Sequence, residues 1–121
     1  MADRMIHISW GASIAGREER GLEVFNEVLG LYGRMQQEGR IESFDVALMA
    51  PNGSPVEGYI NLNGSAAQLA AVRESDDYMR SMADASLVVH DLCIAEGFTN
   101  EGVAKQVAIY QDAIGRVPQT A

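Results

Sequence analysis

The sequence predicts an α+β fold with the element order βαββαβ, in which helices cover one face of an antiparallel sheet and one further helix follows. Three observations support this prediction. A strand-like run, a long helical stretch and a second strand-like run occur in residues 5–50, and the same cycle recurs in 56–97. A turn rich in proline and glycine separates the two cycles at 51–55. The length of 121 residues fits a single domain, 1–121, that buries about two-thirds of the surface of its unfolded chain.

The first cycle begins with a strand and a long amphipathic helix. Residues 5–10 alternate apolar with other side chains, which is the period of a strand with two distinct faces. Small residues at 11–16 indicate a loop. The apolar residues that follow recur at helical spacing, at Leu22, Phe25, Leu29 and Tyr32. Gly39 is placed to end this helix in a left-handed conformation, and residues 44–49 alternate as a second strand.

The second cycle contains a strand and two short helices. Asn52 and Gly53 lie between two prolines, a combination that accepts positive φ and closes a hairpin. Residues 58–63 alternate more regularly than any other segment and predict the third strand. Ser65 is placed to cap the helix that follows. Ser75 precedes two aspartates and indicates a second cap, so we expect a break there.

A fourth strand and a last helix are predicted at the end of the chain. The strand occupies 87–96, with a start between Leu87 and His90. A bulge near His90 would exchange the two faces of this strand. Thr99 or Asn100 is placed to cap the last helix. The apolar side of that helix consists of Val103, Val107, Tyr110 and Ile114.

The charge of the chain restricts its partners. Lys105 is the only lysine, and 9 Lys and Arg against 17 Asp and Glu leave a formal net charge of −8. Neutralisation of phosphates supplies most nucleic-acid affinity, so we expect neither a nucleic acid nor a membrane as partner. No apolar run reaches the roughly 20 residues that span a bilayer, and residues 1–4 are too short and too acidic for a signal peptide. We therefore expect a cytoplasmic protein.

The sequence contains no recognisable cofactor or metal motif. The glycines at 11, 16 and 21 lack the spacing of a dinucleotide-binding loop. Two histidines without a cysteine cluster supply too few ligands for a zinc site, which takes about three or four. Cys93, the only cysteine, lies in an apolar stretch and is expected to be a small buried core residue. We expect neither metal nor cofactor, and no motif decides whether the protein is an enzyme.

The element order, the Asn-Gly hairpin and the strand at 58–64 that enters a helix leading to Asp-Asp-Tyr-Met-Arg at 76–80 resemble the dimeric α+β barrel superfamily. The resemblance implies a ferredoxin-like sheet in the order 4-1-3-2 and a homodimer whose two four-stranded sheets face each other. Members of the superfamily include monooxygenases without a cofactor, haem-degrading oxygenases and lactone isomerases. Such monooxygenases use an Asn, a Trp and a His or Arg inside the barrel. Asn61 and Trp10 match two of these residue types, although the alternation places them on opposite faces.

With this strand order the helices cover an apolar face and leave a polar face open. The apolar face carries Ile6, Ile8, Trp10, Phe44, Val46, Leu48, Ile60, Leu62, Leu92 and Ile94. The open face carries His7, Ser9, Asp45, Met49, Tyr59, Asn61, Asp91 and Cys93. A chain of this length cannot supply a third layer or easily enclose a large cavity. We therefore expect a second copy to cover the open face and any sizeable pocket to be shared with another chain.

His7 is the candidate catalytic residue, because histidine exchanges protons near neutral pH and can act as a general base. Asp45 or Asp91 is placed to orient its ring. The candidate binding residues on the same face are Ser9, Asp45, Tyr59 and Asn61. The alternative interpretation of His7 is a hydrogen-bonded structural residue.

Two functions are consistent with these observations. The first is a homodimer or higher oligomer that binds a small organic molecule, or only its own partner, through the open face. The second is a cofactor-independent monooxygenase or isomerase that acts on an aromatic or polyketide-like compound in a pocket between sheet and helices. Haem binding is a third and least favoured possibility, which a Soret band would reveal.

Overall fold

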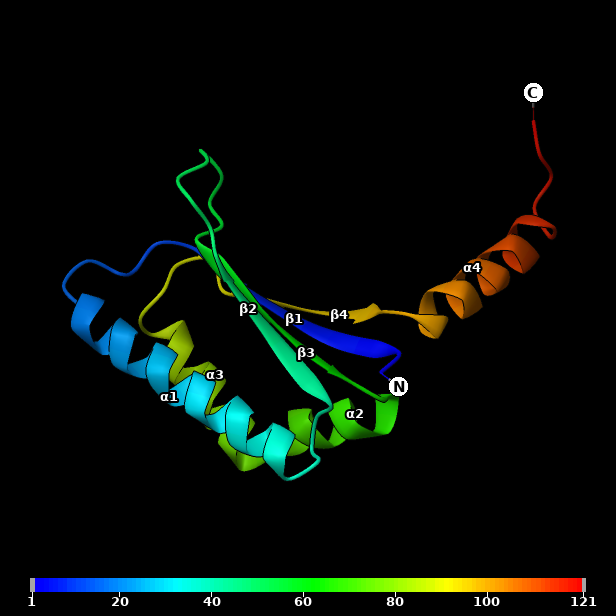
Figure 1. The fold of residues 1–121 in the computed structure, drawn as a ribbon. Coiled ribbons are helices and arrows are strands. Elements are labelled where there is room, and N and C mark those ends of the chain that lie inside the picture. Colours follow the sequence, from blue (N-terminus) through cyan, green and yellow to red (C-terminus); the bar gives the residue numbers. More distant parts are fainter. Residues whose placement is uncertain (1, 121) are drawn as a thin grey trace.

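The computed structural model describes residues 2–120, which form one antiparallel sheet with helices on one of its faces (Figure 1). Its elements are β1 (Arg4–Trp10), α1 (Glu18–Gln37), β2 (Ser43–Leu48), β3 (Gly58–Gly64), α2 (Ala66–Glu74), α3 (Asp76–Ser86), β4 (Cys93–Phe98) and α4 (Glu101–Ile114). The four strands are ordered β2-β3-β1-β4, which is 4-1-3-2 counted from the other edge. This finding confirms the predicted α+β architecture and strand order.

The register of the sheet determines which side chains share a face. In β1, Ile8 lies opposite Ile60 of β3 and Ile94 of β4. Its neighbour His7 lies opposite Asn61 and Ala95. Because directly paired residues of antiparallel strands point to the same side, the isoleucines and the polar residues fall on opposite faces.

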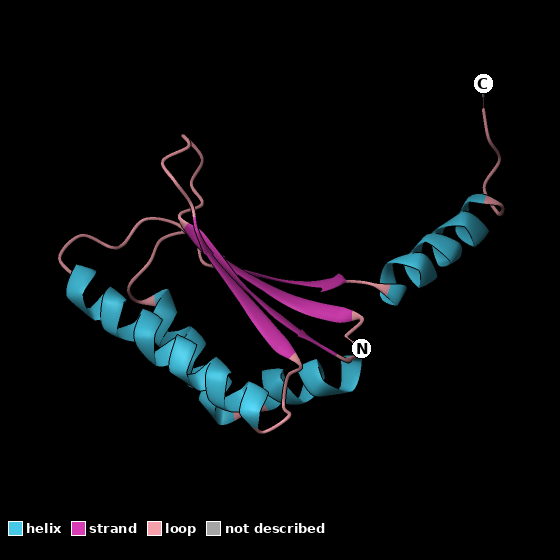
Figure 2. Cartoon of the chain, in the orientation of Figure 1, coloured by secondary structure: helices cyan, strands magenta, loops and turns pink. Residues whose placement is uncertain are grey.

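Figure 2 shows the layer formed by α1, α2 and α3 on one side of the sheet. The core lies between this layer and the sheet. Its buried residues come from alternate positions of the two central strands and from the apolar stripes of the helices. They include Ile6, Ile8, Ile60, Leu62, Val28, Tyr32, Met35, Leu69 and Val72. Full burial of an aliphatic side chain of this kind contributes about 1.5–3 kcal/mol, so the central strands are the main anchor of the helix layer.

Local sequence signals fix the ends of the two short helices. The Ser65 hydroxyl accepts a hydrogen bond from the Gln68 backbone N–H (3.1 Å), and the Gln68 side chain accepts one from the Ser65 N–H (2.8 Å). This reciprocal capping box confirms the predicted start of α2. Ser75 has an extended backbone (φ −79°, ψ 142°), which ends α2 and allows α3 to begin in a new direction.

The fourth strand starts later than predicted. β4 begins at Cys93, and residues 87–92 instead run beside the loop that follows β1. There the Gly11 N–H donates to the His90 carbonyl and the His90 N–H donates to the Ala12 carbonyl, both at 2.8 Å. Asp91 has a φ of 55°, which a strand cannot accommodate, so it precedes the sheet and does not belong to its open face. The predicted phase of the strand nevertheless holds, because Cys93 lies opposite Ser9.

Two expectations about burial are wrong at the edges of the sheet. Val46, Leu48 and Ile94 lie on the apolar face but are exposed, by 39%, 68% and 43%. They belong to the edge strands β2 and β4, whereas the helices cover mainly the centre of the sheet. Cys93 is also exposed rather than buried, since it lies on the open face of β4.

Helix α4 projects away from the rest of the molecule on the side of the sheet opposite α1, α2 and α3 (Figure 1). Asn100 precedes the helix and its side-chain amide donates to the Ala2 carbonyl (2.7 Å) instead of capping the helix. Exposed apolar side chains in and after this helix are Val103, Val107, Ile109, Tyr110, Ile114 and Val117. No helix within residues 2–120 is long and apolar enough to cross a bilayer.

Candidate functional site

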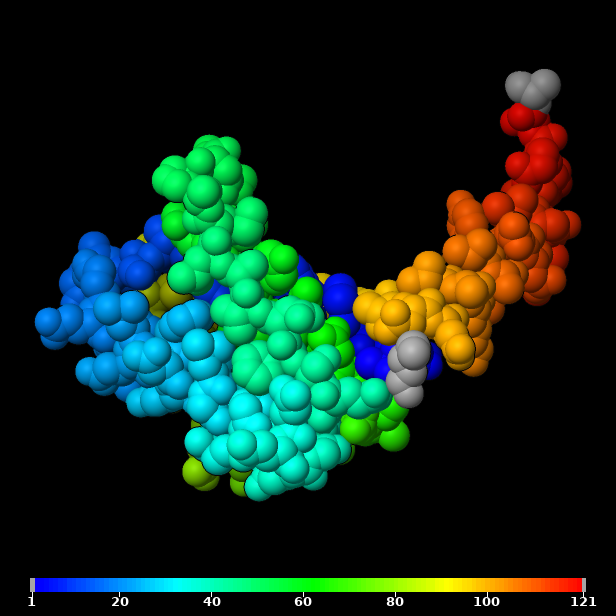
Figure 3. Space-filling view, viewed as in Figure 1, coloured from blue at the N-terminus to red at the C-terminus, as the bar shows by residue number. Residues whose placement is uncertain are grey.

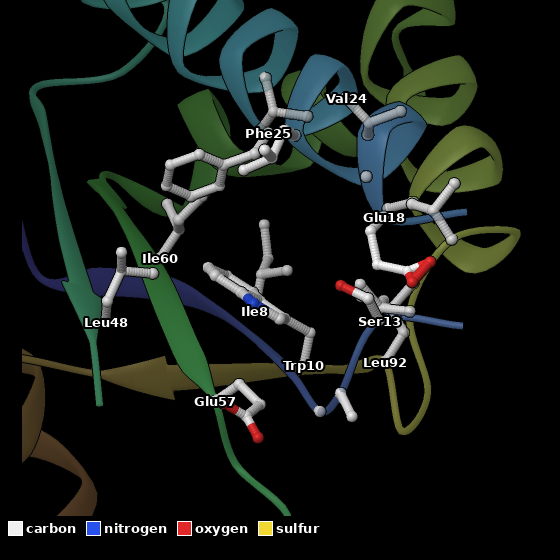
Figure 4. A pocket seen from close by; sticks show the side chains of 18 of the residues that line it. Ile8, Trp10, Ser13, Glu18, Val24, Phe25, Leu48, Glu57, Ile60 and Leu92 are labelled. Carbon is white, nitrogen blue, oxygen red and sulfur yellow. The ribbon is translucent and has the colours of Figure 1, made fainter. Parts of the chain in front are cut away.

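A cavity of about 370 Å³ lies between the sheet and the N-terminal half of α1. Its wall is mostly apolar, and Figure 4 shows Ile8, Trp10, Phe25 and Ile60 around it. Residues of one chain form this wall, and the expectation that a second chain shares any sizeable pocket stays a prediction. The cavity is open to solvent rather than sealed, because its wall includes exposed residues such as Leu48 and Leu22.

Glycines shape this end of the sheet. Trp10 is the last residue of β1 and lies opposite Gly58 of β3. A Cβ atom at Gly58 would lie 2.6 Å from Trp10 Cζ2, so the glycine allows the indole to lie across the strand. Phe25 of α1 meets the indole edge to face, with ring centroids 5.9 Å apart. Gly21 of α1 presents no side chain to the cavity, which leaves part of its volume empty.

The polar side chains of the cavity are acidic or neutral. They are Ser13 and Glu18 on one side of the Trp10 indole and Glu57 on the other (Figure 4). The Glu18 carboxylate accepts a hydrogen bond from the Gly16 N–H (2.6 Å). The Glu57 backbone N–H donates to the Trp10 carbonyl (2.8 Å), which fixes Glu57 beside the end of β1.

A second group of polar side chains lies on the open face and contains the residues that the sequence suggested. His7, Asn61 and Tyr59 meet there, with 2.6 Å between His7 Nδ1 and Asn61 Oδ1. The His7 and Tyr59 rings are 5.3 Å apart. Because the Asn61 oxygen can only accept, the His7 Nδ1 must carry the proton and Nε2 is the acceptor of the neutral ring.

The remaining candidates lie beside this pair but contact it differently from the prediction. Asp45 accepts a hydrogen bond from the Asn63 amide (2.9 Å) rather than orienting His7. Ser9 is nearly buried and lies opposite Tyr59 in the sheet. Asp91 lies outside the sheet, and its carboxylate is close to Gly11 instead. Asn61 therefore takes the orienting role that was expected of an aspartate.

The cavity and the open-face group lie on opposite faces of β1. Trp10 and Ile8 line the cavity, whereas His7 and Ser9 alternate with them and point the other way. None of the five predicted site residues lines the cavity. Sequence reasoning missed Ser13, Glu18 and Glu57, which come from loops and helix ends without periodicity. A glycine paired with a tryptophan in the predicted sheet, at 58 and 10, was the one available signal.

No protein-family model matches the sequence, and no curated protein is significantly similar to it. Solved structures match in fold. A dimeric protein of unknown function and ferredoxin-like fold from Bacteroides fragilis has a TM-score of 0.59 at 10% identity, over 79% of this chain and 96% of that one. An ethyl tert-butyl ether D (EthD) family protein from Bacillus halodurans has a TM-score of 0.63 at 11% identity, over 81% of this chain and 99% of that one. A cofactor-independent oxygenase from Streptomyces nogalater has a TM-score of 0.50 at 11% identity, over 82% of this chain and 93% of that one.

The fold is ferredoxin-like. Proteins with this fold that resemble the chain include dimeric proteins of unknown function and monooxygenase-like proteins. At such low identities the likeness concerns the fold alone, because one fold supports many unrelated activities. The likeness therefore assigns no function to this chain.

Proposed function

We propose that the protein is a homodimer in which each chain binds a small, largely apolar organic molecule in the cavity beside Trp10. The observation that carries this proposal is the cavity itself, with about 370 Å³ of space, a mostly apolar wall and a few polar groups. Ligand pockets in proteins have this size and composition. An engineered apolar cavity of about 150 Å³ holds one benzene molecule, so this larger space suits a compound of two or three rings.

The homodimer is supported by the surfaces that a single chain leaves uncovered. The hairpin between β2 and β3 and helix α4 stand at two ends of a hollow over the open face (Figure 3). The apolar side chains of α4, such as Val107 and Tyr110, are exposed by 49% and 68%. Two similar structures, one of them from Bacteroides fragilis, are described as dimeric. A second copy seated on the open face would bury these side chains.

Binding can be tested with 2-naphthalenemethanol, an uncharged two-ring probe. Trp10 is the only tryptophan and lines the cavity, so its fluorescence reports on occupancy directly. Calorimetry gives an independent affinity. We expect binding by the native protein and an affinity about tenfold lower in Ala85→Leu, which fills the cavity with three added carbons.

The matched control is Ala83→Leu, because Ala83 belongs to the same helix but is exposed and does not line the cavity. This variant should bind the probe like the native protein. The proposal is wrong if the native protein does not bind, or if Ala85→Leu folds and binds as tightly as Ala83→Leu.

The hydrogen bond between His7 and Asn61 favours a second candidate, a cofactor-independent monooxygenase or isomerase. A neutral imidazole with its proton held on Nδ1 presents Nε2 as a general base. In this alternative His7 is the base on the open face, and Ser9, Asp45, Tyr59 and Asn61 bind an aromatic or polyketide-like compound between the two sheets of the dimer. The cofactor-independent oxygenase from Streptomyces nogalater supports the inclusion of this reaction class.

An oxygen electrode with anthrone as the probe tests this alternative, since anthrone and O₂ give anthraquinone and water without a further reactant. His7→Gln should lower the rate by about 100-fold or more if His7 removes the proton. His90→Gln is the control, because His90 is the other histidine and lies outside the sheet. Oxygen uptake no faster than in buffer, or equal in both variants, would exclude this reaction.

A further inference from the structure

The charge around the cavity bears on the kind of molecule that it accepts. Among the described residues that line it, none is Lys, Arg or His, whereas Glu18 and Glu57 both contribute. Asp91 adds a third carboxylate at the same end, because its Oδ2 would lie 3.0 Å from a Cβ atom placed on Gly11, a lining residue. A bound anion would therefore meet carboxylates and no basic side chain within the wall itself, an arrangement that disfavours negative charge.

The two glutamates are not equivalent. Glu18 already accepts hydrogen bonds from the Gly16 N–H, at 2.6 and 3.4 Å to its two oxygens. The Glu57 carboxylate has no hydrogen bond or ion pair with any of residues 2–120, although its backbone is anchored to Trp10. Glu57 is thus the carboxylate that a ligand can engage without displacing a protein contact.

The aromatic wall adds a second preference. The face of an indole attracts a cation, and a carboxylate next to the indole adds to this attraction. Figure 4 shows Glu57 beside the Trp10 indole at the rim of the cavity. A positively charged group at this rim would meet both, while an attached ring system fills the apolar interior lined by Phe25 and Ile60.

We propose that the cavity binds an organic cation with an apolar body, such as a protonated arylalkylamine, with its ammonium group paired to Glu57. This inference rests on the proposed ligand-binding function and specifies the charge of the ligand. The ring system occupies the space between α1 and the sheet, and the ammonium group stays at the rim. Carboxylates, phosphates and sulfonates of the same size are rejected.

Three probes that share one ring system test the inference: 2-naphthylmethylammonium, 2-naphthalenemethanol and 2-naphthoate. Their affinities are compared by calorimetry and by Trp10 fluorescence at low ionic strength. We expect the cation to bind about tenfold more tightly than the alcohol and the carboxylate about tenfold more weakly, and both differences to shrink with added salt.

The variant Glu57→Gln removes the charge and keeps the shape of the side chain. It should lower the ratio of cation to alcohol affinity about fivefold or more, because the cation loses its charge partner whereas the alcohol has no charge to lose. Glu74→Gln is the matched control, since Glu74 is an exposed residue at the end of α2 that does not line the cavity. It makes the same change in net charge and should leave the ratio unchanged.

The outcomes separate the inference from the function on which it rests. If none of the three probes binds, the ligand-binding function is wrong. If the alcohol binds and the carboxylate binds as well or better, the cavity is real but its charge preference is not the one proposed. A cation that binds no more tightly than the alcohol, or a ratio that is the same in Glu57→Gln and Glu74→Gln, also overturns the pairing with Glu57.

Discussion

The two faces of β1 belong to the same seven residues but meet entirely different surroundings. On one face Ile6 and Ile8 are exposed by only 0% and 2%, because α1, α2 and α3 lie over them. On the other face His7 contacts Asn61 and Tyr59 and has no helix above it. The buried apolar contacts of a single chain therefore lie on the face that α1, α2 and α3 cover, called the covered face below, whereas the open face has no layer over it.

The covered face is itself uneven along its length. At the end near Gly64, Tyr32 and Met35 fill the space and are both 0% exposed. At the end near Trp10, the start of α1 stands off from the sheet and leaves the cavity. The packed part of this layer and the proposed ligand site therefore lie at opposite ends of it.

The largest effect that we expect is on the free energy of unfolding, and it should differ between two adjacent residues of β3. Leu62→Ala removes a fully buried side chain from the covered face and should lower the free energy of unfolding by about 2–5 kcal/mol. Asn63→Ala, on the open face, loses only part-exposed hydrogen bonds to Ser43 and Asp45 and should cost about 1 kcal/mol or less. Urea denaturation measures both values. Equal losses would show that the open face also carries the stability of the chain.

The next effect concerns association. A charge placed on the open face, as in Tyr59→Glu or Asn61→Arg, should weaken the proposed dimer by about 100-fold, because it would be desolvated without a partner. Val107→Asp on α4 should act in the same direction. Sedimentation velocity over a range of concentrations gives the dimer dissociation constant of each variant.

The control for these variants is Asn26→Asp, which adds a charge to an exposed position of α1 on the covered side. It should leave the dissociation constant unchanged. A Tyr59→Glu protein that remains dimeric with the stability of the native protein would place the interface elsewhere.

The contrast between the faces was predictable from the sequence because it depends on alternation alone. Every second residue of β1 and β3 is apolar, and this pattern assigned Ile8 and His7 to the correct sides. The cap at Ser65 was predictable for a similar reason, since a hydroxyl before a helix satisfies free backbone N–H groups locally. The break at Ser75 was also predictable, but the Ser75 hydroxyl donates a hydrogen bond to the Val72 carbonyl and does not cap α3. Signals within one segment suffice for such features.

The sequence did not predict features that depend on contacts between distant segments of the chain. Alternation gives the face of His7 but not its partner, which the register between β1 and β3 makes Asn61 rather than an aspartate. The burial of Cys93 depends on what covers β4, and the helices do not reach its open face. The cavity results from the distance between α1 and the sheet, which no periodicity encodes.

An ion pair between Arg40 and Asp77 joins two parts of the helix layer in addition to apolar packing. The Arg40 guanidinium donates two hydrogen bonds to the Asp77 carboxylate, at 2.7 and 3.0 Å, and so joins the segment after α1 to the first turn of α3. These bonds hold the pKa of Asp77 well below its ordinary value of 3.8. A carboxyl group with a lowered pKa in the folded state stabilises the fold above its ordinary pKa, and this contribution is lost as the pH falls below about 4.

Asp77→Asn should therefore lower the free energy of unfolding at neutral pH by about 1 kcal/mol, a modest value because both side chains are a third or more exposed. It should also flatten the loss of stability on acidification below pH 4. Asp76→Asn is the matched control, since Asp76 lies in the same first turn and is exposed. Urea denaturation at a series of pH values compares the two, and parallel pH profiles would contradict the role of the Arg40 pair.

The smallest effect that we expect is a gain in stability from an alanine in α1 beside the cavity. Gly21 lies inside α1, where alanine is favoured over glycine by about 0.5–1 kcal/mol. A Cβ atom there would lie 3.8 Å from Ser13 Oγ and 4.0 Å from Val88 Cβ, which are ordinary contacts. Gly21→Ala should therefore stabilise the protein by that amount, as should Gly33→Ala, whose added Cβ meets nothing within 4 Å.

The two alanine variants differ in only one respect that matters for the cavity. Gly21 lines it and Gly33 does not, so Gly21→Ala alone should also weaken the binding of 2-naphthalenemethanol, by about twofold. Thermal unfolding and calorimetry measure the two effects. If Gly33→Ala stabilises the protein while Gly21→Ala destabilises it, then α1 lies closer to the sheet in solution and the covered face is packed along its whole length.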